Sequence, residues 1–498
     1  MNSTIQKLQI VNDADVVLID FLVSPHYTTK FTANTPDVRL ETAEITFEDG
    51  TRVTSEHYDN VTEEITFAFS ESTGAVMSAR FSTLERVVSD IRRSIEDRSS
   101  LFYLKFQPYS DVPAHISQIL SLYLRREEPR TDELQQQVMR GDSVSSGSFY
   151  SKFTLVLQRV PYWEGPEQVL NVTAQSGSGT EVLINNTDDT AYGNWVTLPA
   201  LDPSQGGLPT PLKVTMRVSS AFDPAGAVYI CNFVDRGNAP VILESEQYSY
   251  LKSGASVADA NASNGYYTTI TTDAGSSVNF SIAWLLTRAQ MADMGGKTFH
   301  VFCCFRNNIY PATLRAKPQW TRNLGQGGTN PQAELANAYS EHTVSDWGGV
   351  VDVGAFRIPP LDQFPGEDID QGVFGVWMAG ISQPLSVNEG RLDFVALFPA
   401  DGGCSYVAVM FAILVSNPGI VTDQKIVVDG RFNVVHLLGL NSGTYYKQTG
   451  AYPVGGPLMY VPGHTNQLHF LFQKLTLGHA PSHATYVSVS LRPRRLFL

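Results

Sequence analysis

Residues 76–98 read VMSARFSTLERVVSDIRRSIEDR, and residues 101–106 read LFYLKF. In the first stretch apolar side chains recur at steps of three and four residues, which is the spacing of one helix face. These side chains are Phe81, Leu84, Val88, Ile91 and Ile95, whereas Arg86, Asp90, Arg93 and Asp97 fall on the other face. The second stretch has the length and aromatic content of a strand. We therefore predict one long amphipathic helix followed directly by a β-strand.

The other patterns around this helix are typical of strands. Apolar runs of strand length occupy residues 10–23, 45–47, 65–69, 116–123 and 153–157. Glu48-Asp49-Gly50-Thr51 predicts a hairpin turn, because Gly50 accepts a positive φ without steric cost. The polar stretch 126–148 is predicted to hold a short helix that begins at Thr131. The N-terminal region is therefore expected to be α+β.

Charge density predicts where this region ends. Residues 1–165 contain 24 acidic and 16 basic side chains, whereas the remaining 333 residues contain only 25 and 19. The first third is almost twice as charged per residue as the rest. We therefore predict a separate domain at residues 1–165.

From residue 166 onward, short apolar runs alternate with Gly, Pro, Asn and Ser, and little helical periodicity is present. Short strands separated by turns are typical of sandwiches and jelly rolls. The best linker pattern is GQGGTNP at 325–331. We therefore predict a mainly β chain with one or two jelly-roll-like β-sandwiches. Residues 166–325 form the first of these, a carbohydrate-binding-like sandwich, and residues 326–498 form a second sandwich or the second half of the same one.

Composition narrows the class of protein. The 498 residues carry a formal net charge of −14, which argues against nucleic acid as a partner because phosphate binding requires a basic surface. No apolar run approaches the roughly 20 residues that cross a bilayer, and the N-terminus lacks the apolar region of a signal peptide. Charged residues are 17% of the chain, below the roughly 25% of ordinary domains, which favours a large oligomer. We expect synthesis and assembly in a cytoplasm.

The cysteines and histidines do not predict a metal site. Cys231, Cys303, Cys304 and Cys404 match no zinc spacing, so we interpret them as reduced core thiols. His464, His469, His479 and His483 lie within twenty residues, but their spacings do not repeat and no nearby Cys or carboxylate completes a ligand set. We interpret them as solvated or hydrogen-bonded histidines, and we predict no metal and no cofactor.

Motifs for catalysis are weak. Met291-Ala-Asp-Met-Gly-Gly-Lys297-Thr298 resembles the end of a phosphate-binding loop, but Met291 replaces the leading glycine, so a turn is favoured. The sequence has no Gly-x-Ser-x-Gly elbow and no His-Glu-x-x-His helix. Carboxylates at Asp188-Asp189 and Glu367-Asp368-Ile-Asp370 leave a polysaccharide hydrolase as a minor alternative. We predict that the protein is not an enzyme and assign no catalytic residue.

Aromatic side chains in Gly, Asn and Ser-rich stretches suggest a sugar-binding alternative. Exposed rings stack on pyranose faces, and loops of sandwich folds supply the amide and carboxylate groups that accompany them. The candidate glycan contacts are Tyr192, Trp195, Tyr266, Tyr267, Tyr445 and Tyr446. The competing interpretation is that these aromatics are ordinary core or interface residues.

Several segments, taken in order, resemble the distal tail (baseplate ring) proteins of tailed bacteriophages. FYLKFQP at 102–108 and TLVLQRVPYWEGP at 154–166 are similar to the end of the N-terminal domain in that family. NNTDD at 185–189, WVTL at 195–198 and LPTPLKV at 208–214 resemble the entry into a following sandwich. PGHTNQLHF at 462–470 and VSVSLRPRRL at 487–496 are similar to the ends of long tail proteins. Residues 216–390 match nothing in the family.

The resemblance implies an architecture and a set of partners. Residues 1–165 would form a split β-barrel with one long helix, and copies of it would pack into a ring, expected to be a hexamer. This ring would join the tail tube protein to hub, baseplate or fibre proteins at the tail tip of the virion. The downstream sandwiches would project outward, either as structural parts or as adhesins for host-surface glycan. Tyr162 and Trp163 would lie at the domain junction, where they either fix the sandwich to the ring or serve as ordinary core aromatics.

Overall fold

The structure is a computed structural model of the chain. It describes residues 5–23, 27–44, 51–71, 74–127, 149–185, 194–202, 206–221, 225–235, 240–259, 262–271, 281–306, 312–322, 340–344, 349–358, 369–380, 389–400, 406–411, 425–441, 444–448, 451–474 and 483–497. The predicted helix at Thr131, the turn at 48–50 and the linker at 325–331 lie outside these residues.

Contacts divide the chain into two compact units. Unit 1 contains Met1–Glu167, Asp202–Leu208 and Arg492–Leu498, and unit 2 contains Gln168–Leu201 and Pro209–Leu491. The chain therefore passes between the units four times. The first segment of unit 1 ends close to the boundary predicted at residue 165, but the two later segments have no counterpart in the predicted ranges.

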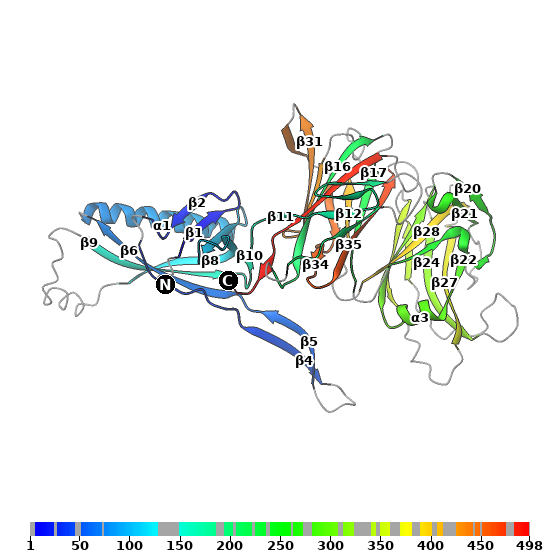
Figure 1. The fold of residues 1–498 in the computed structure, drawn as a ribbon, viewed down its shortest axis with the longest axis horizontal. Helices are drawn as coiled ribbons and strands as arrows, with labels where there is room; N and C mark the ends of the chain where they lie inside the picture. Colours follow the sequence, from blue (N-terminus) through cyan, green and yellow to red (C-terminus); the bar gives the residue numbers. More distant parts are fainter. Residues whose placement is uncertain are drawn as a thin grey trace. The chain divides into compact units, whose positions relative to one another are not determined.

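Unit 1 is built on one antiparallel sheet (Figure 1). Its strands are β1 (Lys7–Asn12), β2 (Val17–Asp20), β3 (Tyr27–Phe31), β6 (Val61–Glu71), β7 (Phe102–Gln107), β8 (His115–Glu127) and β9 (Phe149–Arg159), with the short strands β10 (Trp163–Glu164) and β37 (Arg494–Arg495). The main order is β2-β1-β7-β8-β9-β6-β3. The backbone N–H of Thr28 donates to the carbonyl of Phe21 at 3.2 Å, so the start of β3 lies beside the chain that leaves β2. The predicted split barrel stays a prediction.

The predicted helix is present as α1 (Gly74–Glu96). Leu84, Val88 and Ile91 are buried in the core of unit 1, and Phe81 and Ile95 pack against its edge, which confirms the predicted apolar face. The aromatic ring of Phe81 stacks on that of Phe153 with their centroids 5.0 Å apart. The helix therefore covers one face of the sheet, as amphipathic periodicity requires.

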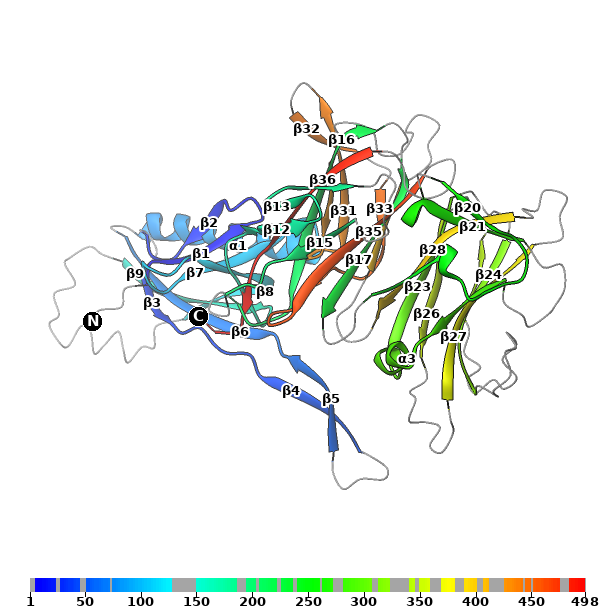
Figure 2. The same ribbon diagram turned by 45° about the vertical axis from the view of Figure 1, so that its right-hand side comes forward.

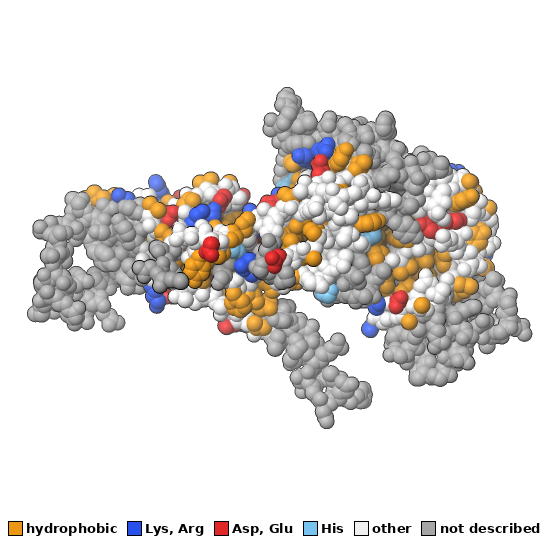
Figure 3. All heavy atoms as spheres, viewed as in Figure 1, with side chains coloured by type: hydrophobic (Ala, Val, Ile, Leu, Met, Phe, Trp, Pro, Cys, Tyr) orange, Lys and Arg blue, Asp and Glu red, His pale blue; other side chains and the backbone are white. Residues whose placement is uncertain are grey.

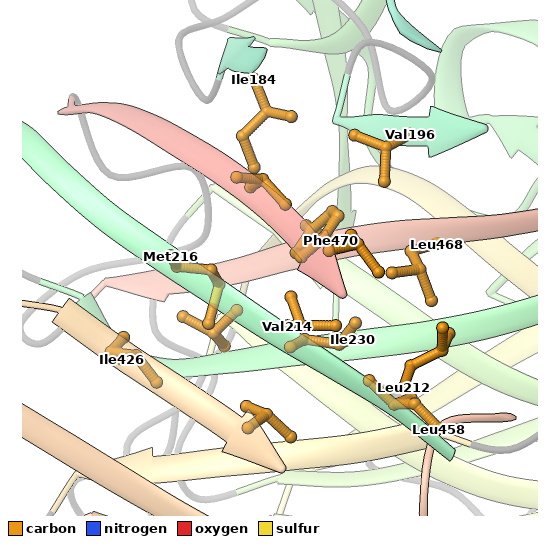
Figure 4. Close-up of a cluster of buried hydrophobic side chains, with 14 of the residues drawn as sticks. Ile184, Val196, Leu212, Val214, Met216, Ile230, Ile426, Leu458, Leu468 and Phe470 are labelled. Carbon is orange, nitrogen blue, oxygen red and sulfur yellow. The ribbon is translucent and has the colours of Figure 1, made fainter. Parts of the chain in front are cut away.

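Unit 2 begins with a sandwich of two sheets, here called the first sandwich. One sheet contains β11 (Gln168–Val169), β14 (Val182–Asn185), β16 (Thr210–Ala221), β30 (Lys425–Asp429), β31 (Val434–Asn441), β32 (Thr444–Gln448), β34 (Met459–Tyr460) and β36 (His483–Leu491). The other contains β12 (Val172–Ala174), β13 (Gly177–Gly179), β15 (Trp195–Leu198), β17 (Ala225–Asp235), β29 (Tyr406–Phe411), β33 (Ala451–Gly455) and β35 (Thr465–Lys474). Side chains from both sheets, such as Met216 and Phe470, meet in one buried core (Figure 4).

The second sandwich consists of two further sheets. One contains β18 (Val241–Glu244), β20 (Ser256–Ala258), β21 (Tyr266–Thr271), β23 (Thr298–Phe305), β26 (Val350–Arg357) and β28 (Glu389–Pro399). The other contains β19 (Tyr250–Leu251), β22 (Ile282–Leu286), β24 (Ala312–Arg322), β25 (Ser340–Val344) and β27 (Ile369–Gly380). Short helices η1 (Ser245–Gln247), η2 (Ser263–Gly265) and α3 (Arg288–Met294) connect some of these strands. The predicted mainly β fold with sandwiches is thereby confirmed.

The two sandwiches are nested along the chain. All strands of the second sandwich lie between β17 and β29 of the first. Strands from both sides of residue 325 also share a sheet, because β24 pairs with β25 and β27. The second sandwich is therefore inserted into the sequence of the first and does not follow it.

A separate apolar cluster joins the sandwiches, and we call it the sandwich junction. It comprises Tyr229, Cys231, Ala408 and Leu471 from the first sandwich and Phe302, Cys304, Val350, Phe394, Ala396 and Phe398 from the second. The rings of Tyr229 and Phe302 meet edge to face with their centroids 5.5 Å apart. The outer faces of one sheet from each sandwich are thus packed together within unit 2.

Candidate functional site: the assembly surfaces of unit 1

A long hairpin, β4 (Val38–Glu44) and β5 (Thr51–Tyr58), extends away from the rest of unit 1 (Figures 1 and 2). Among the described strands, β4 and β5 pair only with each other, with Val38 opposite Tyr58 and Glu44 opposite Thr51. An isolated two-stranded ribbon is marginally stable in water, and each of its outer edges presents unpaired N–H and C=O groups. We call this segment the hairpin arm. It has the backbone groups to add to another sheet.

A fully buried ion pair holds the root of the hairpin arm. The side chains of Glu63 on β6 and Arg159 at the end of β9 are both 0% exposed, and Nη2 of Arg159 lies 2.8 Å from Oε1 of Glu63. The backbone N–H of Asn34 donates to both carboxylate oxygens of Glu63 at 3.1 Å, and Arg159 Nη2 donates to the carbonyl of Asn34 at 2.9 Å. Because Asn34 lies between β3 and β4, the ion pair fixes where the hairpin arm leaves the sheet of unit 1.

The electrostatics of this pair are those of two charges taken out of water. Burial is the largest influence on each group: it raises the pKa of Glu63 and lowers that of Arg159, while the charge of each partner opposes the other's shift. The guanidinium of Arg159 also lies 4.3 Å from the ring centroid of Trp163. Removing one member of a buried pair leaves the other charge unpaired, which costs about 3 to 5 kcal/mol.

The second candidate surface is the edge strand β2. It ends the sheet. Val16, just before the strand, and Val17 and Leu18 within it are 54%, 45% and 37% exposed. Figure 3 shows hydrophobic side chains along the rim of unit 1 where Figure 1 places β2. An exposed apolar edge strand is an association hazard unless another chain covers it. The sheet of unit 1 therefore has an edge suited to protein contact.

The C-terminal segment, residues 492–497, closes unit 1. Arg494 donates from Nε and Nη2 to Oε1 of Glu164 at 3.0 and 2.9 Å, and its guanidinium lies 3.7 Å from the ring centroid of Tyr162. The segment passes close to Gly206, where an added Cβ would lie 2.9 Å from the carbonyl oxygen of Arg494, so only glycine fits there. The last residues of the chain thus complete the domain formed by the first 167.

The predicted junction aromatics lie in this part of unit 1. Trp163 is 1% exposed and belongs to the core of unit 1, with its ring centroid 5.8 Å from that of Phe106. Tyr162 is half-buried beneath Arg494. The position of Trp163 fits the alternative of a core aromatic, whereas Tyr162 is outside the core cluster, and a role in fixing the sandwich remains a prediction.

The five described candidate glycan contacts come from three different sheets. Trp195 lies half-buried on β15, and Tyr266 on β21 is 46% exposed. Tyr267 is half-buried, with the Arg391 guanidinium 5.8 Å from its ring centroid. Tyr445 and Tyr446 belong to β32, where the structure describes only the backbone, and Tyr192 lies outside the described residues. No single sheet brings these residues together.

The described groups that were considered for chemistry do not form one site. Gly296 has a φ of 77°, and the Gly-Lys-Thr sequence leads from α3 into β23, the reverse of the strand-loop-helix order of a phosphate-binding loop. Within the described residues no group of His, Cys, Asp or Glu side chains is arranged to hold a metal ion. The carboxylates at 188–189 and 367–368 and the side chain of Asp370 are not described. No helix in the described part of the chain is both long and apolar enough to cross a membrane.

The described cysteines match their predicted role. Cys231, Cys303 and Cys304 are free and buried, and burial raises the pKa of each thiol. A thiol that stays protonated is a poor nucleophile and a poor metal ligand. Cys404 lies outside the described residues.

Comparisons with known proteins give weak likenesses. No protein-family model matches the sequence, and no curated protein sequence matches it. Among solved structures, SPP1 Dit (gp 19.1), titled a paradigm of the hub adsorption apparatus in Gram-positive infecting phages, is similar at 9% identity over 99% of both chains, with a TM-score of 0.33. The phage P2 baseplate in its activated conformation with Ca gives 9% identity over 99% of both chains and a TM-score of 0.32. The phage p2 baseplate with Sr gives 10% identity over 79% of this chain and 98% of that chain, with a TM-score of 0.22. Likeness at this level assigns neither fold nor function, so both follow from the chain's own residues.

The sequence interpretation missed the ion pair at the root of the hairpin arm. A signal was present, because Glu63 continues the core-facing positions of Ile65 and Phe67, and Arg159 continues those of Leu155 and Leu157. A charged residue at a core-facing position of a strand requires a buried partner. Two such residues of opposite charge in neighbouring strands therefore predict a buried ion pair between them.

Proposed function

We propose that the protein is a structural component of a phage tail tip in which copies of unit 1 assemble into a ring. The observation that carries the proposal is the hairpin arm, whose described strands pair only with each other and whose root is fixed by the buried Glu63–Arg159 pair. A ribbon held in one direction by a buried network is suited to adding to a neighbour's sheet. The sequence resemblance to distal tail proteins supports the same assignment.

We propose a ring rather than a dimer. The hairpin arm and the edge strand β2 are different surfaces of unit 1, so contact between the arm of one copy and another surface of the next is heterologous. Heterologous contacts repeat around an axis and close into a ring when the rotation permits. Covering the exposed Val16, Val17 and Leu18 in the same assembly removes an apolar edge from water.

The proposed partners follow from the position of such a ring. One face binds the tail tube protein, and the other binds hub, baseplate or fibre proteins, within a virion assembled in the host cytoplasm. A net charge of −14 with few charged residues suits contacts with protein and does not suit nucleic acid. The ring is expected to contain six copies, as in the family that the sequence resembles.

Size measurement of the full chain tests this function. Light scattering coupled to gel filtration should give a single high mass, a multiple of 54.7 kDa, and negative-stain images should show rings. Replacing residues 39–57 by a short Gly-Ser linker should give a folded monomer. A monomeric full chain at micromolar concentration, or an unaltered ring in the shortened chain, would refute the proposal.

A second proposed function is adhesion to host-surface glycan by the second sandwich. The observation that favours it is the exposure of Tyr266, which is 46%. Tyr266 is next in sequence to the half-buried Tyr267, and the guanidinium of Arg391 lies near the Tyr267 ring. A glycan array should show binding that Tyr266→Ala weakens at least tenfold, whereas Leu285→Ala, at another exposed position of the same sandwich, should not change it. An array without a bound sugar removes this function. Within the described residues no observation favours the hydrolase alternative, whose candidate carboxylates lie outside them.

A further inference from the structure

His469 occupies an unusual position on β35. Its strand neighbours Leu468 and Phe470 point into the core of the first sandwich, so His469 and Leu471 point to the opposite face, where the sandwich junction lies. The imidazole of His469 is in contact with Phe398 of the second sandwich, with ring centroids 5.3 Å apart. The residue is 8% exposed. A titratable ring therefore lies between two apolar sheets.

Within the described part of the chain, the buried imidazole of His469 has no polar partner. Neither ring nitrogen has a hydrogen-bond partner among the described residues. Its cross-strand neighbours are Trp195 on one side and Cys231 on the other, neither of which carries a charge. A neutral imidazole is tolerated in such a place, but an imidazolium would be a charge removed from water without a partner.

We propose that the sandwich junction is an acid-sensitive joint with His469 as its sensor, so that protonation of this imidazole separates the second sandwich from the first. In the separated state His469 and the apolar face of the junction meet water. The two sandwiches then remain connected only by the two chain connections between β17 and β18 and between β28 and β29. This inference is independent of the proposed ring.

The direction of the response follows from linkage. Burial lowers the pKa of His469 from 6.5 to about 4. An exposed imidazole titrates near 6.5, so the open state binds the proton more tightly than the closed state. The closed junction is therefore fully favoured above about pH 6.5, and this advantage is lost as the pH falls toward 4. For one group with these two values, the closed-to-open equilibrium constant falls about 30-fold between pH 8 and pH 5.

Among the described residues, the other titratable groups of the first sandwich at the junction offer no alternative sensor. Tyr229 and Cys231 lie on the same sheet as His469, and burial raises the pKa of both, so they stay neutral from pH 8 to pH 5. Cys304 of the second sandwich behaves likewise. The second sandwich also contains a contact of 2.6 Å between His300 Nε2 and Asp352 Oδ1, which requires its own control.

Two adjacent cysteines report opening of the junction. Cys304 belongs to the sandwich junction, whereas Cys303 belongs to the core of the second sandwich. Separation of the sandwiches exposes Cys304 and leaves Cys303 buried, and unfolding of the second sandwich exposes both. A disulfide reagent that reacts in acid, such as dithiodipyridine, labels the full chain, and peptide mass spectrometry locates the label. Rates are normalised to a small thiol at each pH.

The expected result is a rise of about 30-fold in the normalised labelling rate of Cys304 from pH 8 to pH 5, with Cys303 unlabelled on the same timescale. His469→Phe, which cannot be charged, should remove the pH dependence, and His469→Gln serves if the Phe variant does not fold. His464→Gln, an exposed histidine near the start of the same strand, and Asp352→Asn should both retain it. A flat wild-type profile, a response that persists in both His469 variants, or equal labelling of Cys303 and Cys304 would overturn the proposal.

Discussion

The carboxylate of Glu63 accepts a hydrogen bond from Nε of Arg159 at 2.9 Å, and neither side chain is exposed to solvent. The same two residues bind the backbone N–H and carbonyl of Asn34. Both charged groups of an ion pair in a protein core lose their hydration. Apolar residues of similar volume therefore often stabilise a protein equally well. Its position suggests another role, which is to fix the chain that enters the hairpin arm.

Breaking this pair on one side should destabilise unit 1 strongly. Arg159→Met leaves the Glu63 carboxylate buried without its partner, and we expect a loss of about 3 to 5 kcal/mol in the free energy of unfolding, measured by urea denaturation. The double variant Glu63→Leu/Arg159→Met should lose less than Arg159→Met alone, because no charge remains buried. Glu64→Gln, on the same strand but exposed, should change stability by less than about 0.5 kcal/mol. Equal losses in the single and double variants would contradict the assignment.

The edge strand β2 should contribute to self-association and little to folding. Val17 is 45% exposed in the isolated chain, so Val17→Lys places a charge where water is present before assembly and absent afterwards. We expect the subunit dissociation constant from analytical ultracentrifugation to rise at least tenfold, with an unchanged melting temperature. Leu285→Lys, at a position 49% exposed on β22, is the matched control and should leave association unchanged. Identical effects of the two substitutions would show that β2 is not part of the contact.

The C-terminal segment should stabilise unit 1. Arg494→Met removes two hydrogen bonds to Glu164, whose side chain is 5% exposed, and we expect a loss of about 2 to 3 kcal/mol in unfolding experiments. Arg217→Met removes a similar pair with Glu181 on the surface, where exposure limits the expected loss to about 1 kcal/mol. If both variants lose the same stability, the C-terminal segment does not close the domain as described.

Unit 1 should lose stability in mild acid through His115. This residue is 1% exposed, and burial, with a contribution from the charge of Arg495, lowers its pKa from 6.5 to about 4. Because the folded value lies below the unfolded one, the stabilisation is complete above about pH 6.5 and declines as the pH falls toward 4. At pH 5 the loss is about 2 kcal/mol relative to pH 8. His115→Gln should flatten the profile of unfolding free energy against pH, and a profile that stays equally steep in this variant would contradict the assignment.

The sequence predicted individual helices and strands better than it predicted which distant segments of the chain pair with each other. The helix at 74–96 and strands such as Phe102–Gln107 were found because each follows from periodicity within one segment. The nesting of the second sandwich inside the first was not found, since the pairing of β16 with β36 joins residues that are more than 260 positions apart and leaves no local pattern. The return of Arg494 to Glu164 was missed for the same reason.

The candidate sites show the same difference between local patterns and long-range contacts. The aromatics proposed as glycan contacts were chosen by local composition, and the five that the structure describes lie on three different sheets. Glu63 and Arg159 were missed, although each occupies a core-facing position in a run of alternating apolar residues. The polar exceptions within such runs contain information about long-range contacts that composition does not.

Electron microscopy of the purified full chain at micromolar concentration tests the central claim most directly. We expect class averages of a closed ring in which the hairpin arm of each copy lies against the next copy, and the ring should be absent when residues 39–57 are replaced by a short linker. Single particles the size of one chain, or a ring held together without any contact from the hairpin arm, would contradict the account.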